Sequence, residues 1–190
     1  MSATDVVPSS DAWAHPSQAE HVREDLQHGR SDDLGRRRAL IGCSLVAVAS
    51  MTAVSLLQTG ILKHLPDPPL PGFDSDRVNL SDTAFKFGVP DGPLGILSAA
   101  ANIPLAAFGT ADRAHTHPWV PLLAAGKAAI DAATAGWYFY QMPAREKAWC
   151  GYCIVGAIAN WAIFVLALPE AGRALASLGG RFGRRRRFAS

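Results

Sequence analysis

In the middle of this 190-residue sequence, long stretches have almost no charge, and that absence decides its class. Four long apolar segments occupy it: 39–62, 93–111, 118–141 and 150–168. Each is near the ~20 residues that cross about 30 Å of hydrocarbon. The only charged residues inside them are Lys127 and Asp131. A soluble helical bundle carries a polar stripe on every helix, and these segments have none. We therefore expect an all-α, multi-pass membrane protein with a four-helix bundle over residues 39–168.

At the first apolar segment, a retained membrane span is favoured over a cleavable signal peptide. The segment starts well inside the chain, and no small-x-small cleavage pattern precedes the next polar stretch. Arginines gather on both sides of the apolar region, in residues 1–38 and 169–190. Because such charges stay in the cytoplasm, both termini are predicted to be cytoplasmic and the loop 63–92 extracytoplasmic, in the cell membrane.

The two ends are expected to be tails rather than parts of the bundle. Residues 1–38 contain few large apolar side chains, which predicts a mobile, disordered cytoplasmic tail. The tail 169–190 carries Arg184-Arg185-Arg186-Arg187, which favours contact with lipid headgroups over binding of nucleic acid. In the loop 63–92, a proline-rich stretch predicts a stiff, extended strap followed by a short helix.

Two ionisable residues lie near the middle of the third apolar segment. Lys127 and Asp131 are four residues apart, the spacing of an ion pair on one helix face. The pair either reduces the cost of both charges in lipid or forms part of a proton path or substrate contact. The sequence leaves both interpretations open.

Cysteine is scarce: the chain has only Cys43, Cys150 and Cys153. The last two start the fourth apolar segment, and residues three apart on a helix share one face. A helix N-terminus stabilises a thiolate through its dipole. Ile154 rather than histidine follows the pair, which excludes a haem attachment motif. The pattern predicts a redox site at the outer membrane surface, on the extracytoplasmic face.

Further residues place this motif in a known context. The aromatic stretch 137–141 precedes the cysteine motif at 148–153. Upstream lie Ser75-Asp76-Arg77-Val78, Ser81, Phe87-Gly88-Val89-Pro90 and Leu94-Gly95. Across residues 39–168 the chain resembles the vitamin K epoxide reductase family, in particular its bacterial members.

The resemblance implies a four-helix membrane bundle around a quinone pocket near the outer face. Cys150 and Cys153 would be the catalytic pair that reduces a membrane quinone, ubiquinone or menaquinone, and becomes a disulfide. Cys153 would face the quinone, and Cys150 would exchange with an incoming thiol. In the family, a second cysteine pair in the loop relays to a thioredoxin-like protein, and the net result is disulfide-bond formation in exported proteins.

The chain departs from the family at this relay. Ser75 stands where the family's loop carries its second relay cysteine, and residues 63–149 contain no cysteine. Cys43 lies roughly 25 to 30 Å from the outer face along its helix, at 1.5 Å per residue. A disulfide needs alpha carbons within about 7 Å, so Cys43 is expected to be a buried packing thiol. The pair would therefore exchange directly with an extracytoplasmic thiol protein, or with a partner subunit that supplies the relay.

The substrate contacts are expected around the same site. Some family members place an aromatic hydroxyl one turn after the second cysteine, where this chain has Ala157. A quinone oxygen would then need another donor, from Ser81, Tyr152 or Asn160. The turn that contains Phe87 would cap the pocket.

Two other classes of function stay open. Paired thiolates suit soft metal ions, which allows a metal carrier. Two cysteines alone close no tetrahedral site, however, so no metal is expected. The other alternative is a structural membrane subunit with a static disulfide, which the missing relay cysteines favour.

Overall fold

The computed structural model of the chain describes residues 17–187, and every element in this range is helical. Four long helices lie side by side: α2 (Asp32–Gln58), α4 (Asp91–Ala107), α6 (Trp119–Gln141) and α7 (Gly151–Arg187). The shorter elements are α1 (Gln18–His28), α3 (Ser75–Asn79), α5 (Arg113–Thr116) and the π-helix η2 (Met142–Glu146). The predicted all-α class is confirmed for the described residues.

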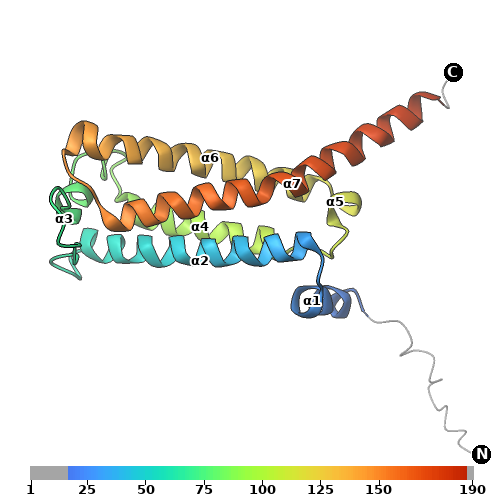
Figure 1. Ribbon diagram of the computed structural model, residues 1–190, viewed down its shortest axis with the longest axis horizontal. Coiled ribbons are helices and arrows are strands. Elements are labelled where there is room, and N and C mark those ends of the chain that lie inside the picture. Colours follow the sequence, from blue (N-terminus) through green and yellow to red (C-terminus); the bar gives the residue numbers. More distant parts are fainter. Residues whose placement is uncertain (1–16, 188–190) are drawn as a thin grey trace, which may run out of the picture.

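The packing of the long helices gives the molecule two distinct ends (Figure 1). Helix α7 packs against α2 and α6, and α2 packs against α4. We call the end that contains α3 and the start of α7 the cysteine end, and the end that contains α1 and α5 the arginine end. Helix α7 continues past the arginine end of the other helices (Figure 1).

Two of the described helices are long and apolar enough to cross a membrane, Asp32–Gln58 and Gly151–Gly180. Helix α4 has 17 residues and is short for a span. Helix α6 has 23 residues, many of them alanine, with Lys127 and Asp131 in its middle. Its bounds agree with the predicted segment 118–141.

The prediction of a mobile tail over residues 1–38 is wrong where the structure describes it, while residues 1–16 lie outside the described residues. Helix α1 begins with a capping box formed by Ser17 and Glu20, and Ser31 caps the start of α2. The Arg38 guanidinium donates hydrogen bonds to the carbonyls of Leu26 and Gly29, at 3.0 and 2.7 Å. These bonds satisfy the free carbonyls at the C-terminal end of α1 and hold it against α2.

The predicted boundary at residue 168 is also wrong, because α7 continues to Arg187 through Pro169. Proline removes one backbone hydrogen bond but does not end this helix. The residues that follow it are anchored by ion pairs to α2: Glu170 binds Arg37, and Arg173 binds Asp33.

Small side chains bring the helices close together. One buried cluster joins α2, α4, α6 and α7 and consists mainly of alanines with two larger residues, Leu40 and Ile163. Such residues let helix backbones approach closely. Cys43 packs against this cluster, as expected of a packing thiol, and is half-buried.

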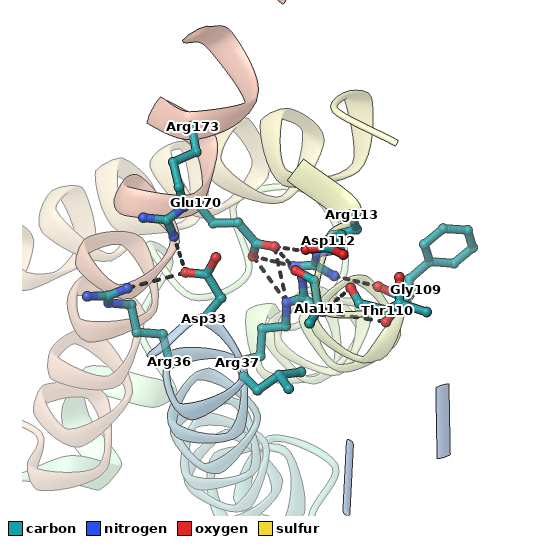
Figure 2. Close-up of polar contacts among 12 residues, drawn as sticks. Asp33, Arg36, Arg37, Gly109, Thr110, Ala111, Asp112, Arg113, Glu170 and Arg173 are labelled. Atoms are coloured by element: carbon teal, nitrogen blue, oxygen red, sulfur yellow. Dashed lines mark hydrogen bonds and ion pairs between the residues drawn. The ribbon is translucent and has the colours of Figure 1, made fainter. Parts of the chain in front are cut away.

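The arginine end is closed by a buried ion network (Figure 2). Glu170 of α7 accepts two hydrogen bonds of 2.8 Å from Arg113 and further bonds from Arg37. Both arginine side chains are only 2% exposed. A carboxylate that binds two guanidiniums through several hydrogen bonds is the arrangement in which buried charges are tolerated.

The same arginines also bind free backbone carbonyls near the end of α4. Arg113 donates to the carbonyls of Leu105, Ala106 and Phe108 at 2.6, 3.1 and 2.9 Å. Arg37 donates to the carbonyl of Thr110 at 3.1 Å. The network therefore caps α4 and joins it to α2, α5 and α7.

Candidate active site

A cavity of about 320 Å³ lies among the four long helices and extends to the cysteine end. Its walls are mainly apolar, with Met51 and Val54 from α2, Leu94 from α4 and Phe139 from α6. Cys153 belongs to the lining and Cys150 does not. The volume falls in the range of roughly 300–1,000 Å³ that small-molecule sites occupy.

The two predicted catalytic cysteines are joined through one amide side chain. The Asn79 amide nitrogen donates to the Cys150 sulfur at 3.1 Å, and the Cys153 sulfur donates to the Asn79 amide oxygen at 3.3 Å. The backbone nitrogen of Cys153 also donates to the Cys150 sulfur, at 3.1 Å. Asn79 was not among the residues predicted from the sequence, because its contact with α7 is made only in the folded chain.

These contacts favour the thiolate of Cys150, which lies one residue before α7 and outside the membrane-spanning segment. A hydrogen bond from Cys153 is the largest influence and brings the pKa of Cys150 down to about 7, with Asn79 adding to the effect and burial opposing it. A thiol with this pKa is substantially ionised at neutral pH. It is therefore a competent nucleophile in thiol–disulfide exchange.

Cys150 is nevertheless covered. Its side chain is fully buried. The loop residues 63–73, which we call the strap, pair with Trp149, its neighbour in the chain. The Trp149 backbone nitrogen donates to the Gly72 carbonyl at 2.8 Å, and the Asp74 nitrogen donates to the Trp149 carbonyl at 3.0 Å. The Cys150 sulfur is therefore closed to other proteins in this arrangement of the strap.

Ser75 occupies a place consistent with a relay position. It is fully buried and lies within reach of Cys150. Its hydroxyl donates to the Asp67 carboxylate at 2.6 Å, which ties it to the strap. A hydroxyl at this place has no redox chemistry and serves packing and hydrogen bonding only.

Three of the four predicted substrate-binding residues line the cavity: Ser81, Phe87 and Asn160. Phe87 is 71% exposed and lies at the rim, next to Gly88, whose φ of 74° forms the predicted turn. Tyr152 is not part of the lining, and its hydroxyl donates to the Pro66 carbonyl in the strap at 3.2 Å. Its contact with the substrate stays a prediction.

The Lys127–Asp131 pair lies toward the opposite end of the cavity from the cysteines. The Lys127 ammonium contacts the Asp131 carboxylate at 2.5 Å, so the two residues form an ion pair, and both interpretations of its role stay open. Asp131 also accepts hydrogen bonds from Ser98 and Asn102 of α4, at 2.8 and 3.1 Å. The pair thus joins α6 to α4, and Asp131 and Ser98 form part of the cavity wall.

The donor chemistry of the cavity suits an uncharged organic ligand. The lining combines apolar walls with hydroxyl and amide groups and one thiol, and each of its three carboxylates already accepts a hydrogen bond from the protein: Asp91 from Gln58, Asp131 from Ser98 and Glu146 from Thr83. Residues 17–187 contain no group of three or more histidine, cysteine, aspartate or glutamate side chains that could hold a metal ion.

Comparison with protein families matches residues 38–168, more than half of the chain, to the vitamin K epoxide reductase family. The matched range includes Asn79, the strap, every helix that lines the cavity and both cysteines of the pair. Among curated proteins, none matches the chain.

Proposed function

This chain belongs to the vitamin K epoxide reductase family, and from that premise we propose that it couples thiol–disulfide exchange at Cys150 and Cys153 to the reduction of a membrane quinone. Membership supports an oxidoreductase of a membrane protein family. One observation carries the finer proposal: the two sulfurs share Asn79, and one of them faces an apolar cavity large enough for a quinone headgroup.

The proposed reaction balances within the pair and its substrate. Cys150 and Cys153 start as two thiols, lose their two S–H bonds and form one S–S bond. The two electrons and two protons that they release convert a quinone, ubiquinone or menaquinone, to the quinol. Asn79 holds both sulfurs in place, and the depressed pKa of Cys150 supplies the nucleophilic thiolate.

The pair is then reduced by another dithiol. An extracytoplasmic thioredoxin-like protein, or a partner subunit that carries the relay cysteines absent here, gives two electrons and two protons and becomes a disulfide. Exchange begins at the Cys150 sulfur after the strap has moved. The overall outcome is disulfide-bond formation in exported proteins.

We place the protein in the cell membrane with four spans, α2, α4, α6 and α7, and with both termini in the cytoplasm. The arginines of residues 1–38 and 169–190 support this orientation, since they lie at the arginine end. The cysteine end is then extracytoplasmic, and the tail after residue 168 contacts lipid headgroups rather than nucleic acid.

The decisive experiment compares Cys153→Ala with Cys43→Ala in membrane vesicles supplied with a short-chain ubiquinone or menadione. We expect Cys153→Ala to abolish quinol production, while Cys43→Ala retains it, because Cys43 lies in the helix packing away from the cavity. Normal quinol production by Cys153→Ala would refute the proposal. The same variant leaves Cys150 free to trap its partner as a mixed disulfide, which mass spectrometry identifies.

A structural subunit with a static disulfide is the second candidate, favoured by the full burial of Cys150 and by Ser75 at the relay position. Differential alkylation of membranes separates the two. A pair whose redox state follows the quinone pool supports the oxidoreductase, and a pair locked in one state under every quinone condition supports the structural subunit.

A further inference from the structure

The hydroxyl groups that line the cavity differ in whether the protein already uses their hydrogens. Ser81 donates to the Val78 carbonyl at 2.8 Å, Thr83 to the Glu146 carboxylate at 2.7 Å, and Ser98 to the Asp131 carboxylate at 2.8 Å. A hydroxyl has one hydrogen to donate. None of these three therefore has a donor left for a ligand.

The amide donors are also largely taken. Asn79 donates both amide hydrogens, to the Ser75 carbonyl at 2.7 Å and to the Cys150 sulfur at 3.1 Å. Asn160 donates one hydrogen to the Gly156 carbonyl at 2.9 Å. It lies seven positions beyond Cys153 in α7, which is roughly 10 Å deeper at 1.5 Å per residue.

Two hydroxyls remain, and both belong to α6. Thr134 and Tyr138 line the cavity, and within residues 17–187 neither hydroxyl makes a hydrogen bond. They lie four residues apart and so share one helix face. A half-buried tyrosine normally finds a partner for its hydroxyl, which makes an unused one beside a cavity a sign of a missing ligand.

Tyr138 is the one of the two at the level of the cysteines. Its neighbour Phe139 packs against the cluster that contains Met142 and Cys150, whereas Thr134 lies one turn deeper in α6. In α7, the lining residues that follow Cys153 are Gly156 and Ala157, which offer no side-chain donor.

We infer that the Tyr138 hydroxyl donates a hydrogen bond to a carbonyl oxygen of the quinone beside Cys153. The inference rests on the proposed function and assigns the residue that orients the headgroup. As electrons enter the ring, negative charge develops on this oxygen, so the bond is stronger in the transition state than in the bound substrate. Tyr138 then acts on turnover as well as on binding.

The test uses Tyr138→Phe in the full chain, with menadione and a short-chain ubiquinone as probes. Because hydrogen bonds to charged groups are worth about 1.5–3 kcal/mol, kcat/KM should fall about tenfold to a hundredfold, with part of the loss in kcat. The matched control is Tyr140→Phe, since Tyr140 is 65% exposed and outside the cavity lining. It should leave both constants unchanged.

A spectroscopic signature accompanies the kinetics. In infrared difference spectra of isotope-labelled menadione, the carbonyl band of the bound quinone should lie below that of the free quinone in the wild type and return toward it in Tyr138→Phe. Replacing Tyr138 with a fluorotyrosine, which donates more strongly, should lower the band further. This variant keeps the ring and the hydroxyl, and so tests the bond even where the Phe variant folds poorly.

The outcomes separate this inference from the proposed function. A wild-type chain that neither binds nor reduces either quinone refutes both. If the wild type reduces quinone and Tyr138→Phe has the same kcat/KM and the same carbonyl band, the inference about Tyr138 is refuted and the proposed function stands. The inference is also refuted if Thr134→Val, rather than Tyr138→Phe, returns the carbonyl band toward that of the free quinone.

Discussion

At the arginine end, Glu170 accepts hydrogen bonds from two arginines that are each 2% exposed, whereas toward the cysteine end the hydroxyls of Thr134, which is exposed, and Tyr138 border a cavity and make no hydrogen bond within residues 17–187. The cavity volume also differs between the two ends. About 320 Å³ is open beside the cysteines, but only about 10 Å³ beside Glu170, which is room for one water at most.

The comparison shows that buried polar groups alone do not mark a site. The arginine end contains the more strongly charged buried cluster, yet all its members bind one another or backbone carbonyls, and it holds four helices together (Figure 2). The cysteine end contains fewer charges but unused donors beside a void. Hydroxyl groups that make no hydrogen bond next to a cavity are what point to a ligand.

Removing the central carboxylate of the arginine end should have the largest effect on stability. Glu170→Ala leaves Arg37 and Arg113 buried without a counter-charge, and we expect the free energy of unfolding to fall by about 3–5 kcal/mol. Unfolding in detergent micelles measures it. Glu146→Ala is the control at the cysteine end, since Glu146 is half-buried and contacts Thr83 through one hydrogen bond. Equal stability of the two variants would contradict the contrast.

The Lys127–Asp131 ion pair shares a feature with each end of the molecule. Its two charges bind each other, as at the arginine end, but Asp131 borders the cavity. Lys127→Met should cost about 1–3 kcal/mol by leaving the Asp131 charge without its cation. Adding Asp131→Asn should restore most of this stability, as measured by unfolding of single and double variants. If the double variant reduces quinone at the wild-type rate, the pair is structural; a large loss of rate shows a proton path or substrate contact.

Asn79→Ala should raise the pKa of Cys150 from about 7 toward its ordinary value, by up to about one pKa unit, because one donor to the thiolate is lost. The thiolate fraction at neutral pH then falls. The ultraviolet absorbance of the thiolate, titrated against pH in a Cys43→Ala background, measures the shift. Asn102→Ala removes an amide that binds Asp131 instead, and should leave the titration of Cys150 in place. An unchanged titration in Asn79→Ala would show that Asn79 does not tune the thiol.

The smallest effect is expected at the strap. Gly72 has a φ of 88°, which a residue with a Cβ adopts at a cost of about 1–2 kcal/mol. Gly72→Ala should loosen the strap and speed alkylation of Cys150 by about fivefold or more. Gly109→Ala imposes similar strain at the arginine end, where φ is 78°. This variant should not speed the alkylation of Cys150. Equal alkylation rates in both variants would mean that the strap does not control access.

Much of the helical framework could be predicted from hydropathy. The segment 118–141 corresponds to Trp119–Gln141, and the last apolar segment starts where α7 does. Its far end was wrong because Glu170 looks like the start of a polar tail. Only the folded chain shows that Glu170 is neutralised by arginines 133 and 57 residues away in sequence.

The site was predictable in its sulfurs and not in its surroundings. Cysteine spacing and the family resemblance singled out Cys150 and Cys153, which the structure brings together with Asn79. The roles of Asn79 and Tyr138 depend on which donors neighbouring backbone groups already occupy, and no spacing rule contains that information. Spacing likewise did not show that the Tyr152 hydroxyl donates to the Pro66 carbonyl of the strap.

Cys153 borders the cavity, whereas Cys150 is fully buried next to Trp149, which pairs with the strap. In the proposed reaction a quinone dissolved in lipid therefore meets only Cys153, and a thiol protein dissolved in water meets only Cys150. Electrons then pass between the two reactants through the closing and opening of one S–S bond, and the reactants themselves do not meet on this protein.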